Sequence, residues 1–179
     1  IEKFFDGIDV VFINVKTADR YDYIMKALLV GKHVICNCPI SNNTQKLITL
    51  LEIAKQNGVI LIESLYLAYM QAFNQMMWMV ESNVIGNCIS VKYGISNSCL
   101  STLTEDELKQ YAAYVVYRIC GNKSFKKFSV FQGKDKNNFY YNTILQYENI
   151  VIDIELGQSV TCGLTVRGEK GILKVPGEW

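Results

Sequence analysis

Hydrophobic and polar positions in the first sixty residues follow two alternating periods. Three short, mainly apolar runs, at 9–14, 33–36 and 59–62, are separated by two segments in which apolar residues recur at helical spacing. Asn42 or Asn43 can cap the second helix, and Gly31 can close the first. Continuously apolar strands are typical of parallel strands that are buried on both faces. Strand–helix–strand–helix–strand with such short connections predicts right-handed crossovers in a parallel sheet.

The pattern changes after Glu63. Apolar residues at helical spacing predict one long amphipathic helix from Tyr66 to Val80, and Thr104-Glu-Asp-Glu107 has the pattern of a capping box that opens another helix. The residues beyond Gly121 alternate as strands do. On the strand 150–156, isoleucines and a leucine share one face and two acidic residues share the other, which predicts a largely antiparallel sheet with one solvated face. We expect the boundary between the two parts near residue 65.

The first predicted strand has neighbours on one side only. A lone apolar edge strand at 9–14 favours pairing with another chain or aggregation. We therefore expect strands upstream of residue 1, or a partner, to cover this edge.

Composition narrows the classes of function. The formal net charge is +1, and lysines such as Lys109 and Lys126 are interleaved with acidic residues, so a nucleic-acid partner is not expected. No apolar run approaches the ~20 residues of a membrane span, so we expect no membrane partner. The six cysteines predict free thiols in a reducing cytoplasm. Cys36 and Cys38 are two residues apart, but His33 is the only histidine, so no metal site is expected.

Several separate blocks resemble one protein family in the right order. They are Gly31-Lys32-His33-Val34 with Pro39, the segment 63–69, Asn83-Val-Ile-Gly86, and Gly168-Glu-Lys-Gly-Ile-Leu-Lys-Val-Pro176. The chain resembles the Gfo/Idh/MocA-type oxidoreductases, closest to their dihydrodiol-dehydrogenase-like branch, with the N-terminal part missing and with degenerate motifs.

The resemblance implies an α/β fold: the rear part of a Rossmann-like parallel sheet, then an α+β domain with a largely antiparallel sheet. Residues 1–65 would be a partial dinucleotide-binding domain and residues 66–179 a substrate and dimerisation domain. It also implies NAD or NADP as cofactor, a sugar, polyol or cyclic diol as substrate, and a homo-oligomer formed through the C-terminal sheet.

The resemblance also carries candidate site residues. The catalytic candidates are Tyr111, where related proteins carry a proton-donating tyrosine, and Cys38, at the position of the family lysine. Candidates for cofactor binding are Val15, Lys16 and Asn37; candidates for substrate binding are Tyr66 and Glu107.

The sequence departs from the family pattern at the positions that carry the chemistry. No Gly-x-Gly-x-x-Gly motif occurs, and the Glu-Lys-Pro of the family is Asn37-Cys38-Pro39. A free tyrosine has a pKa near ~10, and Cys38 cannot supply a cation that would lower the pKa of Tyr111. We therefore expect this chain alone to be inactive, with no cofactor as the alternative to NAD or NADP. The alternative function is a non-catalytic binding or assembly module on the same fold.

Two basic residues after the first strand have two interpretations. Lys16 and Arg20 can meet a cofactor phosphate at the carboxyl end of that strand, where open α/β sheets bind ligands. They can also be solvated loop charges, and we favour this second interpretation. His33 is expected to be a structural residue that opens its strand.

Overall fold

The computed structural model describes residues 5–96, 104–135, 138–158 and 160–177. The chain folds into two compact units, Ile1–Tyr66 and Leu67–Trp179. Each unit has its own sheet, and the two sheets differ in topology.

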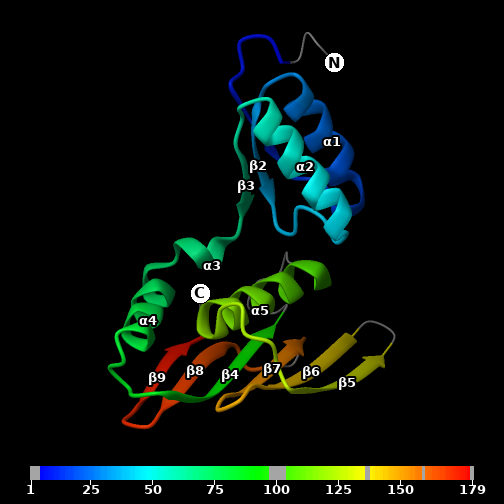
Figure 1. Cartoon of the computed structure of the whole chain (residues 1–179). Helices are drawn as coiled ribbons and strands as arrows, with labels where there is room; N and C mark the ends of the chain where they lie inside the picture. Colours follow the sequence, from blue (N-terminus) through cyan, green and yellow to red (C-terminus); the bar gives the residue numbers. More distant parts are fainter. Residues whose placement is uncertain (1–4, 97–103, 136–137, 159, 178–179) are drawn as a thin grey trace. The chain divides into compact units, whose positions relative to one another are not determined.

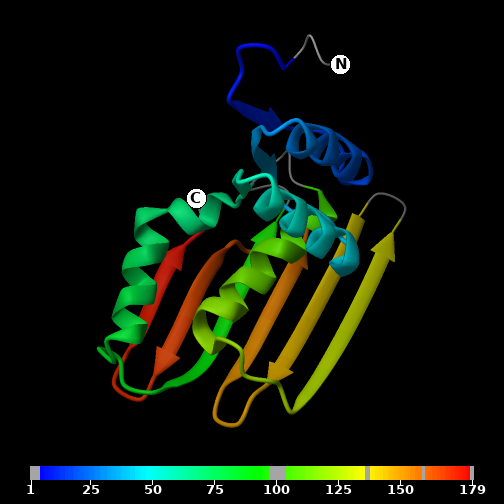
Figure 2. The same ribbon diagram turned by 45° about the horizontal axis from the view of Figure 1, so that its top comes forward.

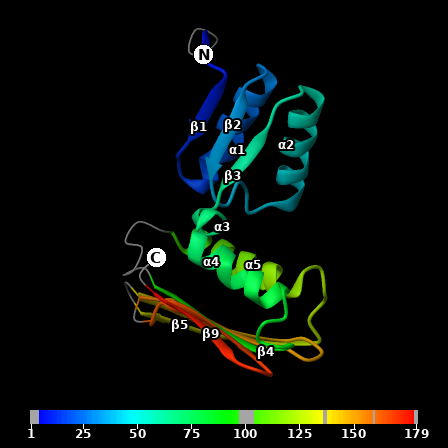
Figure 3. The ribbon, with the colours of Figure 1, turned by 90° about the vertical axis from the view of Figure 1, so that its left-hand side faces the viewer.

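The first unit is a three-stranded parallel sheet with two helices. Its elements are β1 (Val10–Ile13), α1 (Thr17–Leu29), β2 (His33–Asn37), α2 (Thr44–Gln56) and β3 (Leu61–Ser64), and the strand order is β1-β2-β3. Both helices lie on the same side of the sheet (Figure 3). Asn43 caps α2, because its side chain accepts a hydrogen bond from the backbone N–H of Lys46 at 3.0 Å. The parallel sheet predicted from the apolar runs is confirmed.

One face of this sheet is buried and the other is open. Ile13, Val34 and Cys36 pack against α1 and α2, whereas Phe12 on the opposite face is 58% exposed. The expectation that these strands are buried on both faces is therefore wrong for the described residues. A groove of about 500 Å³ runs beside β1 and is lined mainly by apolar side chains, among them Val11 and Phe12. Whether another strand covers this edge stays a prediction.

The second unit is a mixed, largely antiparallel six-stranded sheet. Its strands are β4 (Cys88–Ser96), β5 (Lys127–Asp135), β6 (Asn138–Gln146), β7 (Val151–Gly157), β8 (Gly163–Gly168) and β9 (Ile172–Pro176), in the order β5-β6-β7-β4-β8-β9. Among the described strand pairs of this sheet, only β4–β7 is parallel. The helices α4 (Gln71–Glu81) and α5 (Glu105–Cys120) lie on one face of this sheet (Figures 1 and 2).

The side chains of β7 alternate between the two faces of the sheet, as the sequence predicts. Ile152, Ile154 and Leu156 are buried on the helix side. On the other face Lys92 forms an ion pair with Glu155 at 3.2 Å, and Asn142 donates a hydrogen bond to Asp153 at 2.7 Å.

The long helix expected from Tyr66 to Val80 is interrupted. The chain forms a short helix, α3 (Tyr66–Tyr69), and α4 begins at Gln71, because Met70 adopts an extended conformation with φ −71° and ψ 122°. The Asn74 side chain donates a hydrogen bond to the carbonyl oxygen of Ala68 at 2.9 Å, which satisfies an acceptor that the break leaves outside the helix.

The cysteines do not all follow the expectation of free thiols. Cys36, Cys38, Cys88 and Cys120 are not disulfide-bonded, but Cys162 takes part in a disulfide bond, so the expectation is wrong at this position. None of the helices in the described part of the chain is long and apolar enough to cross a bilayer.

Candidate functional site

The carboxyl ends of β1, β2 and β3 meet at one edge of the parallel sheet. The residues that follow β1 and end β2 carry amide side chains there, and Asn37 donates a hydrogen bond from Nδ2 to Oδ1 of Asn14 at 2.7 Å. This pair is exposed to solvent, whereas the side chains below it are buried. Open parallel sheets bind ligands at this edge because the loops there are free to vary while the strands hold them in place.

Arg20 joins the two loops that border this edge. Its side chain is only 3% exposed; Nε donates to the carbonyl oxygen of Val15 at 2.8 Å, and Nη1 donates to the carbonyl oxygen of Pro39 at 2.7 Å. The interpretation of Arg20 as a solvated loop charge is therefore wrong. The guanidinium fixes the loop after β1 to the loop after β2, since one planar group bonds to both backbones. Lys16, in contrast, is exposed and precedes α1.

The loop after β2 is also fixed from the third strand. Glu63 of β3 accepts a hydrogen bond from the backbone N–H of Ile40 at 2.9 Å. Between these anchors Cys38 is 3% exposed and precedes a cis Pro39. Val15, Asn37 and Cys38 are thus brought together at one edge of the sheet, as their positions after neighbouring strands predict.

Two further residues of β2, Cys36 and His33, have structural roles. Burial, the largest cause, raises the pKa of the Cys36 thiol to about 11, so it stays protonated at neutral pH. His33 accepts a hydrogen bond at Nδ1 from the backbone N–H of Ile60 at 3.0 Å, which agrees with a structural role. The described residues include no group of three or more side chains that could hold a metal ion.

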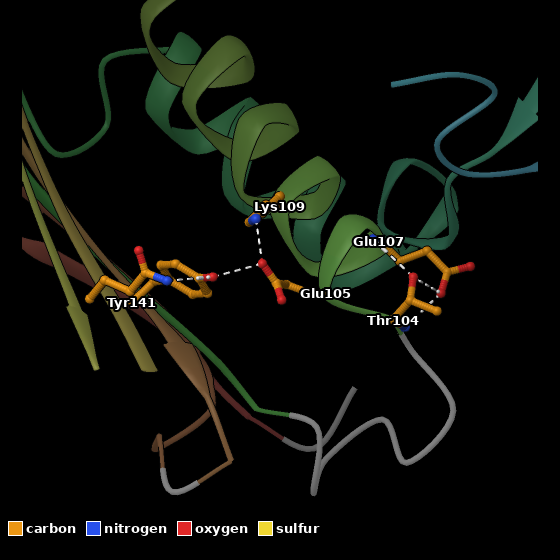
Figure 4. Close-up of polar contacts among 6 residues, drawn as sticks. Thr104, Glu105, Glu107, Lys109 and Tyr141 are labelled. Atoms are coloured by element: carbon orange, nitrogen blue, oxygen red, sulfur yellow. Dashed lines mark hydrogen bonds and ion pairs between the residues drawn. The ribbon is translucent and has the colours of Figure 1, made fainter. Parts of the chain in front are cut away.

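The second set of candidates lies on α5. Glu107 is buried and completes the capping box, because its Oε2 accepts hydrogen bonds from the backbone N–H of Thr104 at 2.7 Å and from its hydroxyl at 2.9 Å (Figure 4). The predicted capping box is confirmed. Tyr111 is also buried, and its neighbour Tyr93 has a pKa raised well above the usual value by burial first and by Tyr111 second.

Tyr66 belongs neither to the residues at the carboxyl edge of the parallel sheet nor to those on α5. It is the first residue of α3 and is 57% exposed.

A polar cluster beside α5 was not expected from the sequence. Glu105 accepts a hydrogen bond at Oε1 from the Tyr141 hydroxyl at 2.8 Å and forms an ion pair with Lys109 (Figure 4). Lys109 also lies 4.9 Å from the centroid of the Tyr141 ring. The hydrogen bond to Glu105 is the largest cause that raises the pKa of Tyr141, so this hydroxyl is a weaker acid than a free tyrosine.

This cluster adjoins a groove in the second unit. The groove has a volume of about 370 Å³ and is lined by Lys109, by the side of α5 that includes Val116, and by strand residues such as Leu145 and Ile154. Only the Glu105–Lys109 part of the cluster has a sequence signal, the spacing of four on a helix. Tyr141 comes from a distant strand, and no local pattern connects it to Glu105.

Comparison with known proteins gives a family for the first unit. Residues 1–65 match the model of the oxidoreductase family with an NAD-binding Rossmann fold. A scyllo-inositol 2-dehydrogenase (NADP(+)) from Bacillus subtilis is 30% identical over 71 residues, which are 40% of this chain and 22% of that protein. A dTDP-3,4-didehydro-2,6-dideoxy-alpha-D-glucose 3-reductase from Actinomadura kijaniata is 26% identical over 81 residues, 45% of this chain and 24% of that protein.

The fold of both units recurs in solved structures. GenD2 from gentamicin A biosynthesis, crystallised in complex with NAD, superimposes with a TM-score of 0.80 at 12% identity, over 96% of this chain and 55% of that one. The chain therefore spans only part of the length of the proteins it resembles. The first 65 residues thus match the Gfo/Idh/MocA oxidoreductase family, and the chain as a whole shares the fold of these solved structures.

Proposed function

We propose that this chain is part of an NAD(P)-dependent oxidoreductase that acts on a hydroxyl-bearing carbon of a sugar, polyol or cyclic diol. The observation that carries the proposal is the match of residues 1–65 to an NAD-binding family model. The names of the two relatives, an inositol dehydrogenase and a deoxysugar reductase, support a ring alcohol as the substrate class.

The residues at the carboxyl edge of the first sheet fit one end of the cofactor. Val15, Lys16 and Asn37 would hold it there, and the exposed amides of Asn14 and Asn37 offer both donors and acceptors. The sequence contains no glycine-rich turn for the pyrophosphate. When bound, a nicotinamide would accept or supply a hydride. The contribution of Arg20 would be to keep the two loops at this edge in place.

The substrate side of the proposal involves residues of α3 and α5. Tyr111 would exchange the proton of the substrate hydroxyl, and Tyr66 and Glu107 would border the substrate. Cys38 stands where the family has a lysine, and a buried thiol provides no positive charge. Glu107 already stabilises the start of α5, so its role would be to orient the helix that carries Tyr111.

A charge placed at the carboxyl edge tests cofactor binding. We expect the chain to bind NADH or NADPH, and Asn37→Asp to weaken this binding at least tenfold, because a carboxylate would repel the cofactor phosphates and remove the amide donor. Nicotinamide fluorescence titration measures the dissociation constant. Asn57→Asp is the matched control, since it adds the same charge to the exposed C-terminal end of α2. No binding by the unaltered chain would favour a non-catalytic module instead.

The role of position 38 has its own test. With binding established, Cys38→Lys is expected to increase turnover of a polyol at least tenfold, because it restores the positive charge of the lysine that the family carries at this position. Turnover is followed as nicotinamide absorbance with a panel of inositols and sugars, and Cys36→Ser controls for the loss of a thiol. If the unaltered chain is as fast as the lysine variant, the interpretation of Cys38 as an inactivating replacement is wrong.

Assembly and location complete the proposal. The face of the six-stranded sheet that α4 and α5 leave uncovered carries exposed Tyr140 and Val151, and we propose that it contributes to a homo-oligomer. We also propose a cytoplasmic location. Disulfides are rare in cytoplasmic proteins, and the disulfide at Cys162 is an observation against this location.

A further inference from the structure

The strand β4 begins with an irregularity that determines where Cys88 points. Cys88 pairs with Gly168 of β8, whereas Ser90 pairs with Arg167, so β4 has one extra residue, Ile89, between the two pairs. An extra residue of this kind is a β-bulge, and it shifts the alternation of side chains between the two faces of the strand.

The register places Cys88 on the face of the sheet that α4 and α5 cover. In β8, Val166 and Gly168 are buried and Arg167 between them is exposed, so Val166 and Gly168 share the helix side. Cys88 shares this side because residues that lie directly opposite each other in two strands point to the same face. Without the bulge, Cys88 would point to the uncovered face.

A second thiol, Cys120, lies at the same end of this sheet. Cys120 is the last residue of α5 and is 3% exposed, and a hydrogen bond joins its thiol to the side chain of Tyr147, between β6 and β7. Because β4 and β7 run parallel from the pair Ser90–Val151, the start of β4 and the β6–β7 connection lie at one end of the sheet. The C-terminal end of α5 also lies at this end (Figures 2 and 3).

Cys120 is near enough to Cys88 to influence its charge. Burial, the largest cause, and the nearby Cys120 raise the pKa of the Cys88 thiol to about 11. Neither thiol is disulfide-bonded, and Cys88 is partly exposed whereas Cys120 is buried. The same unit already contains a disulfide, at Cys162, so its surroundings permit the oxidation of thiols.

We propose that Cys88 and Cys120 form a second, reversible disulfide in this unit, which fastens the C-terminal end of α5 to the start of β4. The co-reactant is a low-molecular-weight disulfide, for which glutathione disulfide is the probe. Cys88, the accessible thiol, loses its proton and attacks one glutathione sulfur, so a mixed disulfide forms and one glutathione leaves. Cys120 then loses its proton and attacks the Cys88 sulfur, and the second glutathione leaves. Two protein thiols are oxidised, and one small disulfide is reduced to two thiols.

The link would act as a tether on the segment from β4 to α5. Closing a loop of about 30 residues restricts the unfolded chain, and this favours the folded second unit by about a hundredfold or more. The tether does not depend on the proposed oxidoreductase activity, because neither thiol is among the proposed site residues. It would hold the helix that carries Tyr111 more firmly to its sheet.

Disulfide mapping tests the proposal directly. The full chain is incubated with glutathione disulfide at mildly alkaline pH, where more thiolate is present. Remaining thiols are blocked with N-ethylmaleimide in denaturant, and the peptides are analysed by mass spectrometry without reduction. We expect a linked pair of peptides that contain Cys88 and Cys120 and that dithiothreitol separates. Cys36 is the internal control: burial also raises the pKa of this thiol to about 11, and it lies in the other unit, so it should carry only the blocking group.

A variant separates the two steps of the reaction. In Cys120→Ser, Cys88 is expected to keep a glutathione adduct, because no second thiol displaces it. The proposal is overturned if both thiols of the unaltered chain carry only the blocking group, if Cys88 of the unaltered chain keeps glutathione, or if Cys88 is linked to a different cysteine.

The second experiment measures the tether. After oxidation, urea denaturation followed by tryptophan fluorescence is expected to show an unfolding equilibrium constant about a hundredfold smaller for the unaltered chain than for Cys88→Ser. Cys162 keeps its disulfide in both chains, so it does not contribute to the difference. Before oxidation the two chains should differ less than about tenfold, because Cys88 is only partly buried. The same difference before and after oxidation would show that no tether forms.

Discussion

Replacing Arg20 with methionine is expected to lower the free energy of unfolding of the first unit by about 3 kcal/mol. The guanidinium donates hydrogen bonds to the carbonyl oxygens of Val15 and Pro39, and it is 3% exposed. Methionine fills much of the same volume but offers no donor, so both carbonyls lose a charge-assisted partner without gaining water. The two loops at the carboxyl edge of the sheet are then held only by their remaining contacts, among them the bond from Ile40 to Glu63.

Hydrogen exchange read by mass spectrometry measures this loss. Both tryptophans, Trp78 and Trp179, belong to the second unit, so fluorescence would report on the wrong part of the chain. The amides of β2 should exchange about a hundredfold faster in the variant, as ~3 kcal/mol implies. Lys16→Met is the control, because Lys16 is exposed and makes no side-chain cap to α1; its effect should stay within about 0.5 kcal/mol. Equal changes in the two variants would show that Arg20 is not a clamp.

Arg20 also shows where a sequence stops being informative. Its position in the first turn of the helix that follows an apolar strand predicts proximity to the carboxyl edge of the sheet, and the structure places it there. The bond to Pro39 joins residues 19 apart in the chain, and no periodicity encodes it. A charged residue on a helix is interpreted as solvated by default, because isolated charges are rarely buried without a partner.

Signals confined to one turn were predicted well, because the interaction lies within a few residues. The capping box at Thr104 and the cap at Asn43 formed as expected. The break at Met70 was missed, because helical periodicity continues through it and neither glycine nor proline marks it. The contact between Glu105 and Tyr141 was missed because the partners are 36 residues apart.

The prediction for β1 failed for a different reason. A continuously apolar run indicates that a strand is stable when both of its faces are covered. It does not indicate which segment covers them. Phe12 is exposed in the structure although its strand has the composition of a buried one.

Gly168→Ala is expected to destabilise the second unit by about 3 kcal/mol or more. A Cβ at this position would lie 2.2 Å from the backbone oxygen of Ile85. That oxygen cannot move away easily, because it accepts a hydrogen bond from the N–H of Lys170 at 2.8 Å and Glu169 donates to the carbonyl oxygen of Asn87 at 3.1 Å. Relief of the clash would therefore separate the β8–β9 turn from the segment before β4.

Gly171→Ala provides a control within the same turn. Its Cβ would meet only the Cγ2 atom of Ile85, at 3.6 Å, an ordinary van der Waals distance. Urea denaturation followed by the fluorescence of Trp78 should therefore show a large decrease in midpoint for Gly168→Ala and a change below about 1 kcal/mol for Gly171→Ala. Both glycines belong to the Gly168-Glu-Lys-Gly171 block that resembles the family, so the resemblance treats them alike. If the two variants lose the same stability, the close approach of the turn to Ile85 is not what requires glycine at position 168.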